Sequence, residues 1–286
     1  MNKGLTLTIV FEASSLNYGD GMGNIASLKK VVKADGKTYS YISRQALRYN
    51  IVEQLGCNDT PTDNKSGVVQ FSPEATIDKY PEIDYFGYMK TEKGDSGQKR
   101  SAVVRLSNAD SLMPFASDLD FLNNMGLAAR CKCGNDLASS EIHHSMYSYT
   151  MTIDLERLGI DGDIEIPTEE KIERVCKLLD VISCLHRDIK GRTENLNPIF
   201  MIGGLYDTKN PFFHGSVKLK SGKLDCDLIA DTIENSSITK EHTLVSAISG
   251  RFVNEEEVRK ICTDSMSDMF DKLKKEVRKY YESNTD

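Results

Sequence analysis

The sequence predicts an α+β fold in which strand-like and helical segments follow one another in the order β, α, β, β, β, α, β. Apolar residues alternate with threonine near the amino terminus, which is typical of a strand, and two later segments repeat apolar residues at helical spacing. With 286 residues, of which 39% are hydrophobic and 28% charged, the chain holds enough apolar side chains for a sizeable core. This composition indicates a soluble globular protein and excludes a disordered chain.

The first strand is expected from about Gly4 to Ser14, and its apolar run is too short for a signal-peptide core or a membrane span. The first helix is expected over 43–56. Ser43 suits the N-cap position, apolar residues recur at helical spacing behind it, and Gly56 suits the C-cap. Local sequence patterns therefore predict both the first strand and the first helix.

The later elements are separated by polar, irregular insertions at 57–82 and 108–141, the second with a short helix expected near Leu119–Asn123. A second helix is expected from Pro167 to about His186, followed by a basic loop at 187–197. Further strands are predicted at Asp84–Met89, Ser101–Leu106, Ser145–Leu155 and Pro198–Leu205. Without the insertions, this order is close to the βαββαβ pattern of ferredoxin-like folds.

Helical stretches are predicted in the carboxyl-terminal part, near Leu224–Asn235, Glu241–Ser249 and Glu255–Tyr281. They are expected to pack beside the core. The chain shows no repeat of solenoid length and no low-complexity tract.

The net charge of −7 argues against general binding to nucleic acid or to anionic membranes. The charge is unevenly distributed, however. Residues 1–56 and 167–223 each carry a net charge of +3, whereas 111–166 carry −6 and 224–286 carry −5. Any site for a polyanion is therefore expected in the two basic blocks.

The first basic block contains the start of the first predicted helix. Free backbone N–H groups and the positive end of the helix dipole favour an anion at Ser43. Arg44 and Arg48 are four residues apart on one helix face, so both guanidinium groups could reach neighbouring phosphates. The alternative is an ordinary capped helix with two surface arginines.

The second basic block contains the loop between the second helix and the last core strand. Gly191 lets the backbone approach a ligand closely, and Lys190 and Arg192 flank it. In a ferredoxin-like fold, this loop and the start of the first helix could lie along one groove. The alternative is a solvated connection.

Metal-binding and catalytic signals are weak. Four possible zinc ligands lie within fourteen residues, but their spacing is not that of a standard zinc finger, so no metal is expected. They are Cys131, Cys133, His143 and His144. Seven cysteines without a regular framework indicate reduced thiols in a cytoplasm. No serine elbow or Walker-type loop is present, so no enzyme activity and no cofactor is expected.

Several stretches of the first 205 residues or so form a recognisable set: Leu5–Ala13, Leu16-Asn17-Tyr18, Gly23-Asn24 with the lysine pair that follows, Tyr41–Tyr49, Ser117–Phe121, Tyr147–Leu155 and the loop before Asn197-Pro198. Together they resemble the DevR family of CRISPR-associated proteins, the backbone subunit of a type I-B Cascade. The resemblance implies an RRM-like palm, as in the wider RAMP superfamily.

The palm would occupy 1–223, with fingers inserted at about 57–100, a thumb at about 120–142, and the helical segment 224–286 packed on it. Copies would stack head to tail along one CRISPR RNA (crRNA) into a helical filament, together with other Cascade subunits. The filament would present the spacer for pairing with a target DNA strand. The implied location is the cytoplasm, away from membranes.

The resemblance also implies which residues contact RNA. The family's RNA-contacting helix start and the superfamily's glycine-rich loop fall in the two basic blocks. The predicted RNA-binding residues are Asn17, Lys29, Lys30, Ser43, Arg44, Gln45, Arg48, Lys190, Gly191 and Arg192. Phosphate contacts of this kind give affinity for RNA of any sequence. Base pairing between crRNA and target would provide the sequence specificity.

Two other functions stay open. Related type III backbone proteins cleave target RNA through an acidic loop residue, for which Asp20 is the candidate, although an aspartate in a turn is common. A free-standing regulator that binds a small ligand or a protein is the other alternative.

Overall fold

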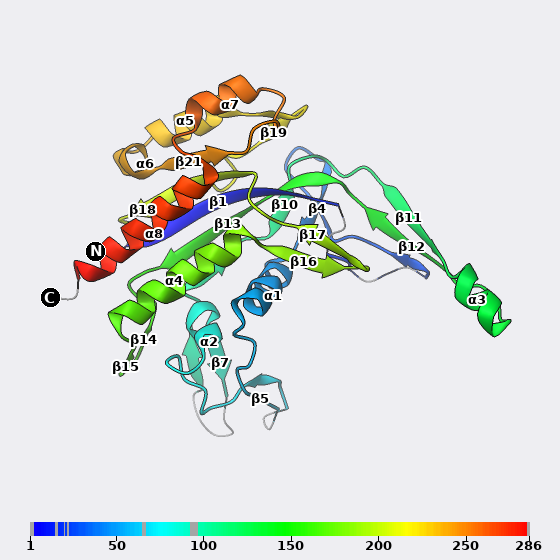
Figure 1. The fold of residues 1–286 in the computed structure, drawn as a ribbon, viewed down its shortest axis with the longest axis horizontal. Helices are drawn as coiled ribbons and strands as arrows, with labels where there is room; N and C mark the ends of the chain where they lie inside the picture. Colours follow the sequence, from blue (N-terminus) through cyan, green and yellow to red (C-terminus); the bar gives the residue numbers. More distant parts are fainter. Residues whose placement is uncertain are drawn as a thin grey trace.

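A large antiparallel sheet lies at the centre of the computed structural model, which describes residues 3–14, 17–19, 21, 23–64, 67–91 and 97–284 (Figure 1). Its strands have the order β21-β18-β1-β13-β10-β4-β3, and β9 also pairs with β13. They are β1 (Gly4–Ala13), β3 (Lys30–Val32), β4 (Thr38–Ile42), β9 (Val104–Leu106), β10 (Ala109–Ser111), β13 (Ser145–Asp154), β18 (Phe200–Tyr206) and β21 (Leu244–Ala247). The predicted mixture of helices and strands is confirmed.

Strand β1 is central because both of its edges are paired. It runs antiparallel to β13 from Gly4 opposite Asp154 onward, and antiparallel to β18 from Gly4 opposite Tyr206. A Cβ atom at Gly203 of β18 would lie 2.0 Å from the carbonyl oxygen of Thr6, so only glycine allows β18 to approach β1 this closely.

Three helices cover one face of the sheet: α1 (Arg44–Leu55), α4 (Thr168–Ser183) and α8 (Met266–Glu282) (Figure 1). Alternate residues of β1, such as Leu7 and Ile9, join the buried residues of these helices in one core. The prediction of α1 is confirmed in detail, because the Ser43 hydroxyl accepts the Ala46 N–H and Gly56 adopts a left-handed φ of 64°. The prediction of α4 is also confirmed.

An arm projects from one end of the sheet (Figure 1). We call the segment 118–142 the arm; it consists of β11 (Asp118–Asn123), α3 (Met125–Cys131) and β12 (Leu137–Ile142), with β2 (Ile25–Ala26) parallel to β12. The helix predicted at Leu119–Asn123 is wrong. These residues form β11, because β12 supplies hydrogen-bonding partners along the whole segment.

The insertion at 57–100 forms a small layer beside α1. It contains β5 (Thr62–Asp63), β6 (Gln70–Phe71), α2 (Pro81–Phe86), β7 (Tyr88–Lys90) and β8 (Gln98–Arg100). The strand predicted at Asp84–Met89 is wrong over Asp84–Phe86, since Pro81 begins a helix that ends only at Phe86, and only its last two residues belong to a strand, β7. In the predicted strand Ser101–Leu106, only the part from Val104 onward forms a strand, β9.

Asp84 joins this insertion to the helical layer. Its carboxylate is fully buried and pairs with Arg100 of β8 at 2.6 Å and with Arg174 of α4 at 2.8 Å. It also accepts the N–H of Gly159 at 3.0 Å. A buried carboxylate with this many charged and polar partners fixes the elements that carry them.

Three short hairpin elements connect the larger ones: β14 (Ile160–Asp161) with β15 (Ile164–Glu165), β16 (His186–Ile189) with β17 (Arg192–Asn195), and β19 (Leu219–Lys220) with β20 (Lys223–Leu224). The second of these replaces the loop predicted at 187–197. That loop prediction is therefore wrong over β16 and β17.

The carboxyl-terminal part covers the other face of the sheet beside β18 (Figure 1). Its helices α5 (Cys226–Glu234), α6 (Ser237–His242) and α7 (Glu255–Ile261) accompany β21. The helix predicted at Glu241–Ser249 is wrong over 244–247, because this segment pairs with β18 as β21. The helix predicted at Glu255–Tyr281 is divided in two, since Cys262 turns to an extended conformation and the chain restarts as α8.

Within the described ranges, no helix combines the length and the apolar character needed to cross a membrane.

We expect Asp84→Asn to lower the free energy of unfolding by about 3–5 kcal/mol, because two buried guanidinium groups lose their shared counter-charge. Denaturant unfolding followed by circular dichroism measures this loss. The matched control is Asp207→Asn, which removes the half-exposed ion pair with Lys3 and should cost no more than about 1 kcal/mol. Equal losses in the two variants would contradict the role of Asp84.

Candidate nucleic-acid interface

The turn of the β16–β17 hairpin consists of Lys190 and Gly191. Both residues have positive φ angles, 50° and 75°, as in a type I′ turn. A Cβ atom at Gly191 would have nothing within 4 Å, so this glycine is explained by the turn itself and not by a close approach to neighbouring protein atoms. The turn presents Lys190 at the end of a rigid ribbon.

The hairpin is fixed to the rest of the molecule through its strands. Arg187 and Glu194 form a buried ion pair at 2.6 Å across the ribbon. Glu194 also accepts the backbone N–H of Ser14, directly after β1. On the other side, the Gln54 amide of α1 donates to the carbonyl of His186 at 2.6 Å. The position of Lys190 is therefore set by β1 and α1.

The two basic blocks meet at Tyr18. The ammonium group of Lys190 lies 4.1 Å from the centre of the Tyr18 ring. The Tyr18 hydroxyl donates to the carbonyl of Glu141 in the arm at 3.1 Å. Its neighbour Asn17 accepts the backbone N–H of Ser43 at 3.3 Å. The structure thus places Asn17 against Ser43, and Lys190 against the neighbouring Tyr18. That these residues line one groove for RNA stays a prediction.

Tyr18 is absent from the residues predicted to bind RNA. An aromatic ring beside basic side chains is a common platform for nucleic-acid bases. The sequence signal for this residue was the position of Tyr18 in a glycine-rich loop.

A cavity of about 330 Å³ opens next to the contact between Lys190 and Tyr18. It is lined by Gly21, Gly23, Asn24, Ile25, Ala26, Leu122, Ala138, Ser139, Ser140 and Lys190.

The predicted residues Lys29 and Lys30 differ in their surroundings. Lys30 pairs with Glu141 at 2.7 Å and lies 4.5 Å from the centre of the Phe115 ring, so it joins the base of the arm to β3. Lys29 donates its backbone N–H to Asn17, and its side chain is half-buried. The charge of Lys30 is therefore neutralised within the protein.

At the start of α1, more backbone N–H groups are hydrogen-bonded within the protein than the sequence suggests. The N–H groups of Ser43, Arg44 and Ala46 donate to the Asn17 side chain, the Asn108 side chain and the Ser43 hydroxyl. The expectation of free N–H groups is therefore wrong for these three. The exposed side chains of Arg44 and Gln45 stay available, together with the helix dipole.

Arg44 and Arg48 are not equivalent. Arg48 pairs with Glu82 of α2 at 3.0 Å, and its guanidinium carbon lies 4.8 Å from the centre of the Phe86 ring. Arg44, by contrast, is exposed. That both reach phosphates stays a prediction, and the two arginines differ because Arg48 is held against the 57–100 insertion.

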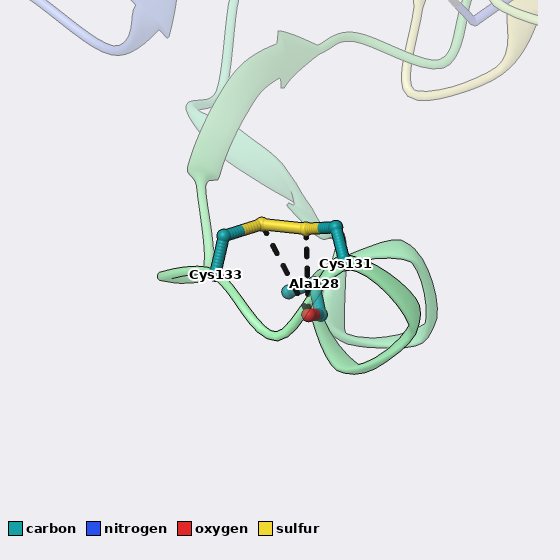
Figure 2. Close-up of a disulfide and its surroundings, with 3 residues drawn as sticks. All are labelled: Ala128, Cys131 and Cys133. Carbon is teal, nitrogen blue, oxygen red and sulfur yellow. Dashed lines mark hydrogen bonds between the residues drawn. A yellow bond between two sulfur atoms is a disulfide. The ribbon is translucent and has the colours of Figure 1, made fainter.

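The four possible zinc ligands do not converge. Cys131 and Cys133 form a disulfide at the end of α3, with their sulfur atoms 3.5 and 4.0 Å from the carbonyl oxygen of Ala128 (Figure 2). His143 is buried in a different place, and His144 pairs with Glu12 at 2.9 Å. Among the described residues no cluster of metal ligands forms, and the expectation of reduced thiols is wrong for this cysteine pair.

His143 lies at the base of the arm. Its Nδ1 atom is 2.7 Å from the Ser40 hydroxyl, and its backbone N–H donates to the carbonyl of Ser14. Burial lowers the pKa of His143 below its ordinary value of 6.5. A neutral imidazole at neutral pH thus joins the arm to β4 and to the end of β1.

Asp20, the residue considered for RNA cleavage, lies outside the described residues.

Comparison with known proteins gives the family. Residues 5–225 match the family described as "CRISPR-associated negative auto-regulator DevR/Csa2". The chain belongs to the DevR/Csa2 family. This confirms the resemblance inferred from sequence. No curated protein matches this DevR/Csa2 chain.

Two solved structures share the fold of this DevR/Csa2 chain. A chain of a "CRISPR RNA-guided surveillance complex, pre-nicking" has a TM-score of 0.68 and 11% identity, and the match covers 96% of this chain and 100% of that one. A chain of a "CRISPR RNA-guided surveillance complex" has a TM-score of 0.61 and 13% identity, over 95% and 98% of the two chains. The likeness extends beyond residue 225 into the carboxyl-terminal part.

We expect the stability of the protein to fall as the pH is lowered through 6.5, the ordinary pKa of histidine. The buried His143 has a lowered pKa, so the unfolded chain binds this proton more readily than the folded chain does. Urea unfolding at a series of pH values should show that the free energy of unfolding depends less on pH in His143→Gln than in the wild type. Exposed His214→Gln is the control and should follow the wild type. An unchanged pH dependence in His143→Gln would contradict this role.

Proposed function

We propose that this chain is the repeated crRNA-binding backbone subunit of a type I-B CRISPR Cascade. It binds the sugar–phosphate backbone of crRNA without sequence preference, polymerises along it, and presents the spacer to the target DNA strand in antiviral defence. Membership of the DevR/Csa2 family supports the class of complex. The observation that carries the RNA-binding role is the meeting of the two basic blocks at Tyr18 and Lys190.

The sheet supports an RRM-like palm. The strands β18-β1-β13-β10 are adjacent in this order and antiparallel, and α1 and α4 cover one face. This strand order and helix placement support the proposal of a βαββαβ ferredoxin-like palm. In the proposal the arm is the thumb, the 57–100 insertion is the fingers, and 224–286 is the segment packed on the palm.

The charge distribution suits RNA of any sequence. Lysine and arginine contacts to phosphates provide affinity without reading bases, and base pairing between crRNA and target then provides specificity. The acidic remainder of the chain discourages nonspecific binding to polyanions. The subunit acts by positioning RNA, and its role requires no catalytic group.

The arm supports polymerisation. Its strands β11 and β12 belong to a small sheet to which β2 adds only two paired residues, and the arm exposes apolar side chains over more than half of their surface. They are Leu119, Phe121, Leu122, Met125 and Leu127. In the proposal the next copy along the RNA covers this arm, and contacts of this head-to-tail kind generate open filaments.

We expect the protein, when purified from cells that express a CRISPR array, to carry intact spacer-containing RNA of every spacer in the array. Sequencing of the bound RNA measures this. Protein that carries no RNA and does not bind added crRNA would contradict the proposal and favour a regulator. Cleavage of added RNA would favour the nuclease alternative.

We expect Phe121→Ser to lower the number of copies that assemble on one RNA, because it removes an exposed apolar side chain from the arm. Sedimentation of the protein–RNA complex measures the assembly size. The stability of the free protein should change by less than about 0.5 kcal/mol, as for other surface substitutions. Val253→Ser, at a still more exposed apolar position in the carboxyl-terminal part, is the control. Unchanged assembly in Phe121→Ser would contradict the role of the arm.

A further inference from the structure

A second basic cavity lies at the start of α1, on the side of the 57–100 insertion. Its volume is about 440 Å³. It is lined by Arg44, Gln45, Arg48, Phe86, Ala102, Val104, Arg105 and Leu106. Three arginines therefore line one cavity, two from α1 and one from β9.

The three arginines differ in their partners. Arg48 is neutralised by Glu82, as described above. Arg44 and Arg105 are exposed, and no carboxylate in the described part of the chain pairs with either of them. The buried arginines of the protein behave differently, since Arg100 and Arg187 each have an acidic partner.

Two unpaired guanidinium groups at one cavity repel each other, and an anion between them would relieve this repulsion. Guanidinium groups bind phosphate oxygens through paired N–H donors, and the Gln45 amide adds a further donor on the same helix turn. Apolar atoms of Phe86, Val104 and Leu106 border the cavity and strengthen such contacts by displacing water. The chemistry therefore matches a phosphodiester.

We propose that this cavity holds a phosphodiester of single-stranded RNA, and that Arg105 is an RNA-binding residue that acts together with Arg44 and Gln45. The inference rests on the proposed RNA-binding function and adds a contact to it. Arg48 is a positioning residue, which forms one wall through Glu82 and Phe86. The second cation of this site, beside Arg44, is thus Arg105. The pairing of β9 with β13, in which Arg105 lies opposite Thr152, sets its position at the cavity.

This contact is separate from the one at Lys190. The two cavities share no lining residue. The first lies between the segment 21–26, the arm and the Lys190 turn, whereas the second lies between α1, α2 and β9. In this inference one RNA strand contacts both and passes Asn17 and Asn108, whose side chains accept backbone N–H groups at the start of α1.

The test is the salt dependence of binding to a fluorescent oligouridylate, measured by anisotropy for the full chain. Loss of one phosphate contact to single-stranded RNA should lower the salt slope by roughly 0.7. We expect this for Arg105→Gln and for Lys190→Gln, with about twice the loss in the double variant because the sites are independent. Arg105→Lys should keep the slope.

Arg259→Gln is the matched control, since Arg259 is an exposed arginine of α7 and pairs with Glu255. Its slope should equal that of the wild type. If Arg105→Gln also keeps the full slope while the wild type binds RNA, the inference is wrong and the proposed function stands. If Arg105→Glu changes only self-association, the cavity binds a protein carboxylate and the inference is again wrong. Absence of RNA binding by the wild type would overturn both.

Discussion

The pairing of β1 along both of its edges is the constraint on which the rest of the structure depends. It fixes the registers of β13 and β18, and thereby which residues of β1 face α1, α4 and α8. It also fixes where the chain leaves the sheet. There Ser14 binds Glu194 of the hairpin, so the same strand that organises the core positions the Lys190 turn beside Tyr18.

The buried ion pairs of Asp84 perform the corresponding task for the 57–100 insertion. A charge taken out of water is retained only with close partners, and Asp84 has two guanidinium groups and a backbone N–H. Because α2 is fixed in this way, Glu82 can hold the half-buried Arg48 against the 57–100 insertion. The cavity at Arg44 and Arg105 therefore depends on a salt-bridge network that contains neither residue.

In the proposed function, an acidic chain binds a polyanion, and the distribution of its ion pairs explains how. Several basic side chains of the two positive blocks are already neutralised: Lys30 by Glu141, Arg48 by Glu82 and Arg187 by Glu194. Two exposed cations of these blocks, Arg44 and Lys190, line separate cavities. Affinity for phosphate thus depends on which charges lack partners, and not on the net charge of a block.

The sequence by itself determined the elements whose signals are local. The caps of α1, the apolar spacing of α1 and α4, and the alternation in β1 and β13 predict these elements because neighbouring residues decide them. Segments 119–123, 186–189, 192–195 and 244–247 became strands only because a partner strand accepts their hydrogen bonds. Part of the candidate site, Ser43, Arg44 and Lys190, was predicted from basic residues at a helix start and in a loop. Tyr18 and Arg105 emerged only in three dimensions, because strand pairing and ion pairing between distant residues decide which side chains stay free to meet a ligand.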